Sequence, residues 1–88
     1  MAKPNNYFMY KVISNKTCVT LRTEMIRTTN LEWDFKSYNE AYDFYVEHVK
    51  EHASHIGTLN ATHIKHDIQL VQINEEGTIL HYRLHLSN

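Results

Sequence analysis

The stretch that decides the fold is residues 37–57, which read SYNEAYDFYVEHVKEHASHIG. Ser37 and Glu40 have the S-x-x-E spacing of a capping box, in which two side chains satisfy backbone N–H groups at the start of a helix. Gly57 can adopt the left-handed conformation that commonly ends one. Between these signals, apolar and aromatic residues recur at the helical period. They are Tyr38, Tyr42, Tyr45, Val49, Ala53 and Ile56. The sequence therefore predicts one helix of about 19 residues with a single buried face, including Tyr42, Tyr45 and Val49.

Two segments before this helix alternate between apolar and polar residues, the pattern of a strand with one buried face. The first covers residues 7–13 and the second residues 17–28. Residues 14–16, Ser-Asn-Lys, have turn chemistry, so we expect a β-hairpin here. Residues 31–35 alternate again. They predict either a short third strand or an extended arm that leads to the helix.

A second hairpin is predicted after the helix. Ile64, Ile68 and Leu70 share one phase that Val71 breaks, which indicates a bulge or a two-sided strand end. Residues 74–77, Asn-Glu-Glu-Gly, predict the hairpin loop, with glycine where the backbone needs a positive φ. The last strand alternates cleanly, with Leu80, Tyr82, Leu84 and Leu86 on one face and Ile79, His81, Arg83 and His85 on the other.

The predicted order of elements is ββ(β)αββ. Because one helix covers only one face of a sheet, we expect an α+β domain of two layers, with a mostly antiparallel sheet of four to five strands. Residues 1–6 would be a flexible tail and residues 7–88 a single domain. A β-grasp arrangement, with the first and last strands parallel in the centre of the sheet, is the alternative.

The alternation also predicts which side of the sheet meets the helix. The covered face would carry Leu80, Tyr82, Leu84, Val19 and Leu21. The open face would carry Thr20, Arg22, Lys65, His81, Arg83 and His85.

Length and composition limit the class of protein. A chain of 88 residues has room for one domain with one modest core. The single Cys18 excludes a disulfide framework, and nine basic against ten acidic residues create no overall field for nucleic acid. No apolar run reaches the ~20 residues that cross a bilayer, and residues 1–6 lack the apolar core of a signal peptide. We therefore expect a cytoplasmic protein with no membrane partner.

Seven histidines are the least ordinary feature of the composition. His48, His52 and His55 lie four and three positions apart on the predicted helix, so they share one flank. Two histidines at i and i+4 can bind a metal, which makes His48 and His52 the candidate ligands. The candidates for a third ligand are His63, His66 and Cys18. The competing interpretation, which we favour from sequence alone, is that these rings line the border of the core.

The sequence contains no recognisable catalytic motif. The two glycines, Gly57 and Gly77, are too few and too far apart for a phosphate-binding loop, and no G-x-S-x-G or zinc-cysteine cluster occurs. We therefore expect no enzyme and no cofactor.

The leading functional hypothesis is a small non-enzymatic protein-interaction module. Proteins of this size and character are often small regulators or inhibitors of a larger partner, including phage and mobile-element products, and the richness in Asn, Thr, Ile and Lys adds slightly to this interpretation. The expected contact residues are Phe44, His48, Glu51, His55, Ile79 and Arg83. Because Ile26, Phe44 and Ile79 lie outside the main core phase, we also expect a homodimer beside an unidentified protein partner.

Two alternatives belong to other functional classes. One is a His-rich metal-binding protein that uses His48 and His52. The other is a weak nucleic-acid binder that uses Arg22, Lys65 and Arg83 on the open sheet face.

Overall fold

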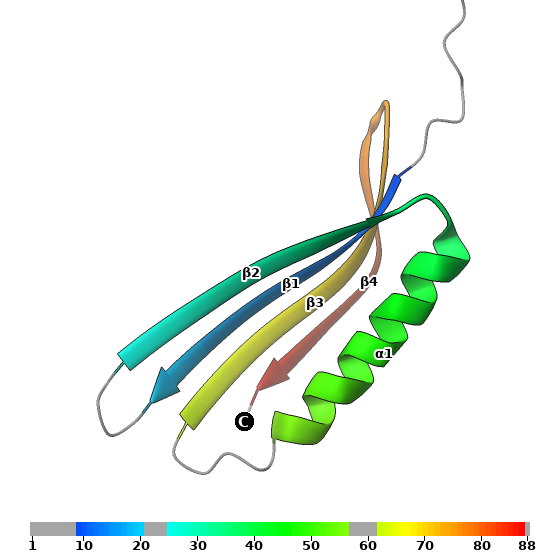
Figure 1. The fold of residues 1–88 in the computed structure, drawn as a ribbon. Coiled ribbons are helices and arrows are strands. Elements are labelled where there is room, and N and C mark those ends of the chain that lie inside the picture. The colour runs from blue at the N-terminus through cyan, green and yellow to red at the C-terminus, as the bar shows by residue number, and fades with distance from the viewer. Residues whose placement is uncertain (1–8, 21–24, 57–61, 88) are drawn as a thin grey trace, which may run out of the picture.

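The computed structural model describes residues 9–20, 25–56 and 62–87, which form four strands and one helix. In chain order these are β1 (Met9–Thr20), β2 (Met25–Phe35), α1 (Tyr38–Ile56), β3 (Thr62–Asn74) and β4 (Gly77–Ser87). The strands make one antiparallel sheet in the order β2-β1-β3-β4, and α1 lies along one face of it (Figure 1). This confirms the predicted two-layer α+β class. It excludes the β-grasp alternative, because β1 is antiparallel to both of its neighbours. The predicted tail, residues 1–6, lies outside the described residues.

The predicted turn at residues 14–16 is wrong. β1 runs unbroken through Ser14, Asn15 and Lys16, and all three pair with residues of both β2 and β3. A central strand has a neighbour on each side that satisfies its backbone N–H and C=O groups, and this outweighs a local preference for a turn. Residues 31–35 are accordingly neither a third strand nor an arm, but the second half of β2.

An unbroken β1 also changes which residues face the helix. Val12 belongs to the core under α1, and alternation carries the same face through Ser14, Lys16 and Cys18. Val19 therefore lies on the open face, whereas the sequence prediction placed it on the covered one. Thr20 lies on the covered face, again opposite to its prediction.

A bulge interrupts the pairing of β3 with β4 at Val71, where the sequence suggested a bulge or a two-sided strand end, but the extra residue lies on β4, which had been expected to alternate cleanly. Leu70 pairs with Tyr82 but Val71 pairs with Leu80, so His81 is the extra residue on β4. Because Cα partners on neighbouring strands share a face, Leu80 lies with Val71 on the open side. The prediction for Leu80 is therefore wrong, and those for Tyr82 and Leu84 are correct.

The bulge places His81 on the helix side as well. Its ring lies 6.3 Å from that of Tyr10 and 5.6 Å from that of Tyr38, which are both in the layer between sheet and helix. An inserted residue allows two successive side chains to share one side of a strand. His81 is thus not on the open face, as the sequence had suggested.

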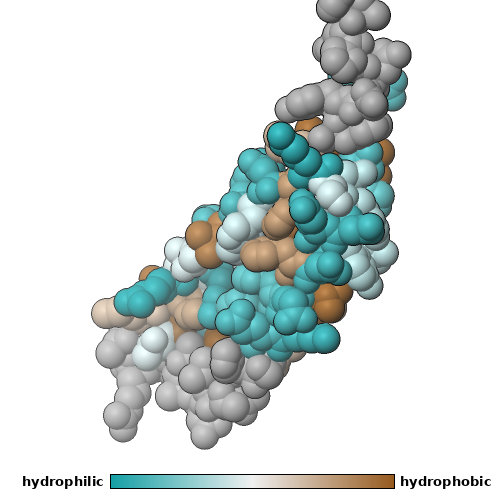
Figure 2. All heavy atoms as spheres, turned by 45° about the vertical axis from the view of Figure 1, so that its right-hand side comes forward, coloured by the Kyte–Doolittle hydropathy of each residue, from teal (hydrophilic) through white to brown (hydrophobic). Residues whose placement is uncertain are grey.

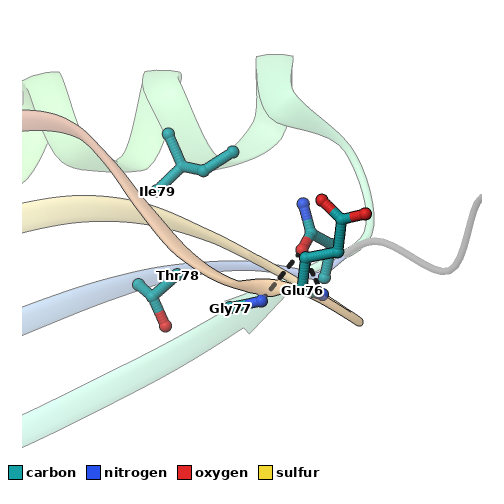
Figure 3. Close-up of a pocket in the computed structure, with 5 residues that line it drawn as sticks. Glu76, Gly77, Thr78 and Ile79 are labelled. Carbon is teal, nitrogen blue, oxygen red and sulfur yellow. Dashed lines mark hydrogen bonds between the residues drawn. The ribbon is translucent and has the colours of Figure 1, made fainter.

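The loop between β3 and β4 is the predicted Asn-Glu-Glu-Gly turn (Figure 3). The Oδ1 atom of Asn74 accepts hydrogen bonds from the backbone N–H groups of Glu76 at 2.8 Å and Gly77 at 3.1 Å. Gly77 has a φ of 140°, a conformation that side chains disfavour.

α1 has the predicted bounds and start. The backbone N–H of Glu40 donates to the Ser37 hydroxyl at 3.4 Å, and that of Ala41 donates to the Ser37 carbonyl at 3.1 Å. The buried core beneath the helix joins α1 to the two central strands. It consists of Val12, Ala41, Tyr45, Ile68 and Leu70.

The buried stripe of α1 is rotated from the predicted one. Tyr45 is buried and Val49 packs on the core, as expected. Tyr42 is 39% exposed, whereas Ala41 is fully buried and Phe44 packs against the core. The reason is that α1 must also cover the aromatic side chains of β2, which the sequence had placed in the sheet only as one of two alternatives.

Candidate histidine site

Three histidine rings meet between α1 and the sheet. His48 and His52 lie one turn apart on α1, and His66 comes from the central strand β3. The ring centroids are 4.3 Å apart for His48 and His52, 4.6 Å for His52 and His66, and 5.7 Å for His48 and His66. We call these three residues the histidine cluster. The sequence predicted two of its members and had the third among its candidates.

Strand alternation brings His66 to this position. It lies between Ile64 and Ile68, and all three side chains are buried on the helix side of β3. His63, three residues earlier, is on the opposite face and exposed. The shared phase of His66 with the two isoleucines is the signal in the sequence that distinguishes the two histidines. Cys18, the remaining candidate, is half-buried on the covered face.

The hydroxyl of Ser14 on β1 contacts two rings of the histidine cluster from the sheet. Its Oγ lies 2.5 Å from Nε2 of His66 and 3.1 Å from Nε2 of His48. A hydroxyl has one hydrogen, so it donates to one ring and accepts from the other. Ser14 is 3% exposed. Sequence reasoning missed its role, because it had assigned this residue to a turn.

Burial favours the neutral form of His48 and His66. It lowers the pKa of His66 to about 4 and also lowers the pKa of His48, and the neighbouring His52 adds to both effects. Lys16 lowers both further, by a smaller amount. Near neutral pH, His48 and His66 are therefore imidazoles with one lone pair each on nitrogen, the form that binds metals.

Aromatic rings close the β2 side of the histidine cluster. The ring of Trp33 lies 5.0 Å from that of His48, and the ring of Phe44 is stacked on His48 at 5.7 Å. Phe44 also contacts Trp33 and Phe35, at 4.7 and 5.3 Å. Phe44 thus packs against the core, and its predicted role in partner contact stays a prediction.

The other predicted contact residues do not gather on one surface. Glu51 is exposed on α1, while Ile79 and Arg83 lie on opposite faces of β4. Arg83 donates to the carboxylate of Asp67 at 3.1 Å. The side chain of His55 lies outside the described residues. The predicted set is thus divided between the helix side and the open face.

The residues suggested for nucleic acid make no basic patch in the described part of the chain. Lys65 and Arg83 lie on the open face, but the next open-face residue of β3 after Lys65 is Asp67, whose carboxylate accepts a hydrogen bond from Arg83. Arg22 is not among the described residues.

Exposed apolar side chains gather instead at the β4 edge. Ile79, Leu80, Tyr82 and Leu84 are 36–53% exposed. The ring of Tyr42 on α1 lies 5.6 Å from that of Tyr82 and extends this surface. Figure 2, which brings the α1 side of Figure 1 forward, shows apolar areas among hydrophilic ones. We call these five residues the β4 surface; Leu80 lies on the open side of this edge strand, and the other four lie on the helix side.

Comparisons of the chain with protein-family models, curated proteins and solved structures give no match. Within the described residues, no helix is both long and apolar enough to cross a membrane.

Proposed function

We propose that this protein is a small non-enzymatic interaction module that pairs with a second copy of itself through β4. The observation that carries this proposal is the composition of that edge. β4 is the last strand of the sheet, and it holds four of the eight exposed large apolar side chains among the described residues.

An edge strand offers a ready contact. One row of its backbone N–H and C=O groups has no neighbouring strand, and a further strand can pair with them. Burying an exposed Ile or Leu stabilises a complex by up to about 1.5–3 kcal/mol, and a two-fold contact uses each residue twice. The β4 surface supplies both the hydrogen-bonding groups and the apolar area.

The charges favour β4 over the opposite edge. Apart from histidines, the only basic or acidic residue between Gly77 and Ser87 is Arg83, which already bonds Asp67 of its own chain. Two antiparallel copies of β4 would therefore meet without strong repulsion. β2, by contrast, carries Arg27, Glu32 and Asp34 along its length.

The same edge can serve a larger partner protein. A strand of that partner would replace the second copy and pair with β4 in the same way. A regulator or inhibitor could act through such a strand addition.

The test is the mass in solution of the full-length, untagged chain at tens of micromolar, by light scattering coupled to gel filtration. We expect about twice the chain mass of 10.5 kDa. Leu80→Lys introduces a charge at the β4 edge and should give a monomer. Ile26→Lys is the matched control, because Ile26 is also exposed on the open face but belongs to β2.

A wild-type mass near 10.5 kDa would overturn the proposal. A dimer that survives Leu80→Lys but separates with Ile26→Lys would assign the contact to β2 and contradict the choice of β4.

A further inference from the structure

The face of α1 that carries His48 and His52 also carries Glu51. Positions i, i+3 and i+4 of a helix are neighbours, and one ligand atom from each of these residues lies within 4.8 Å of the other two. In four-coordinate zinc sites the donors lie roughly 3.4 Å apart, given bond lengths of about 2.0–2.1 Å. Side-chain rotation alone can close that difference, since all three residues belong to one regular helix.

The donor types select the class of ion. Two imidazole nitrogens and one carboxylate oxygen suit zinc and the neighbouring transition metals, whereas magnesium and calcium prefer oxygen donors. His48 is half-buried, and its ring packs against those of Trp33 and Phe44. This distinguishes the set from an exposed group of acidic side chains.

An independent observation in the same cluster also indicates a missing ligand. His66 is 1% exposed, and its Nδ1 atom has no hydrogen-bond partner among the described residues. Its Nε2 is occupied by Ser14, which also contacts His48. Buried polar atoms are nearly always paired, so an unpaired nitrogen beside two candidate metal ligands requires an explanation.

A bound cation would supply that explanation. If His48 donates to Ser14 through Nε2, its Nδ1 keeps the lone pair that a metal needs. Ser14 then donates to Nε2 of His66, and the Nδ1–H of His66 is left as a donor for an oxygen ligand of the metal. Ser14 would then act on the metal indirectly, because it holds the rings of His48 and His66 in their orientations.

We propose that His48, Glu51 and His52 ligate a divalent transition-metal ion of the zinc class, and that His66 and Ser14 support it from the sheet. The site joins α1 to β1 and β3, so metal binding stabilises the packing of the helix on the sheet. It is separate from the β4 surface and does not depend on the function proposed for that surface.

Zinc ions alone are the probe, with the full-length untagged chain at neutral pH. Calorimetric titration should show one zinc per chain, and magnesium should give no binding. At free zinc of one hundred times Kd, we expect the melting temperature to rise by about 10 °C or more, because the ion binds only the folded state.

Three variants test the ligand assignment. His52→Ala should weaken zinc binding at least tenfold. Glu51→Gln should weaken it as well while leaving the fold intact, because Glu51 is exposed and the amide has the same size. His85→Ala is the matched control, since His85 is exposed on the open face of β4 and should keep wild-type affinity.

The absence of zinc binding by the folded wild-type chain would overturn the proposal. Wild-type affinity in both His52→Ala and Glu51→Gln would do the same. Loss of binding in His55→Ala with wild-type affinity in His48→Ala would also contradict it, because the ion would then sit further along the helix.

Discussion

At the scale of single residues, the burial of His66 strongly disfavours its protonated form. A histidine between two buried isoleucines loses the water that would solvate its charged form. The surrounding groups do not compensate, since His48 and His52 on α1 and Lys16 on β1 all oppose a positive charge, while the nearby Asp67 favours it only weakly. The ring is therefore held neutral in the folded protein.

This predicts a stability that declines in acid. The pKa of His66 falls from 6.5 in the unfolded chain to about 4 in the folded one, so between these values only the unfolded chain takes up the proton. The contribution of neutral His66 to the free energy of unfolding should thus be fully present above pH 6.5. It should fall by roughly 3 kcal/mol as the pH is lowered to about 4, since one pKa unit is worth about 1.4 kcal/mol. Urea unfolding with a chelator present measures the free energy of unfolding at neutral pH and at about pH 5.

The matched pair for this measurement is His66→Gln and His85→Gln. Glutamine at position 66 keeps a hydrogen-bonding group for Ser14 but cannot titrate, so the pH dependence should flatten. His85→Gln, at an exposed position, should leave the pH dependence of the free energy of unfolding unchanged. An identical slope in wild type and His66→Gln would show that another group causes the acid sensitivity.

At the scale of elements, α1 depends on a local signal at its start. The Ser37 hydroxyl accepts the N–H of Glu40, one of the amides that a helix leaves unpaired in its first turn. Ser37→Ala should therefore lower the free energy of unfolding by about 1 kcal/mol, measured by urea denaturation. Ser87→Ala, an exposed serine at the end of β4, is the control and should have little effect. Equal losses in the two variants would argue against a capping role.

Elements differ in how well the sequence predicts them, and the reason is the range of the interactions that hold them. The cap of α1 and the Asn74 turn involve residues at most three positions apart, and both were predicted correctly. The course of β1 depends on β2 and β3, which lie far along the chain, so local turn chemistry at residues 14–16 was misleading. That one error also reversed the predicted faces of Val19 and Thr20.

The histidine site follows the same division. His48 and His52 come from one helix, and their spacing alone brought them together. Ser14 and His66 meet them through pairing of β1 with β3 and packing of α1, which no local pattern encodes. The apolar residues expected to form one contact surface were separated for a similar reason, because Ile26 and Ile79 lie on strands at opposite edges of the sheet.

At the scale of the whole molecule, the fold has two separate surfaces with different chemistry. The histidine cluster lies between α1 and the central strands, while Leu80 lies on the open face of an edge strand. Two sites are coupled only if one ligand changes the free energy of the state that the other binds. The two proposed sites share no residue, and Leu80, which the test replaces, lies on the opposite face of the sheet from the histidine cluster. Zinc binding and self-association should therefore be independent.

This independence can be measured in both directions. Leu80→Lys should bind zinc with an affinity within about twofold of wild type, a coupling of less than about 0.5 kcal/mol. A chelator should leave the mass of the wild-type protein unchanged by light scattering. Ile26→Lys serves again as the control for a lysine placed on an exposed edge strand. A dimer that separates when zinc is removed would contradict the prediction, because it would place the metal where two copies meet, with ligands contributed by both chains.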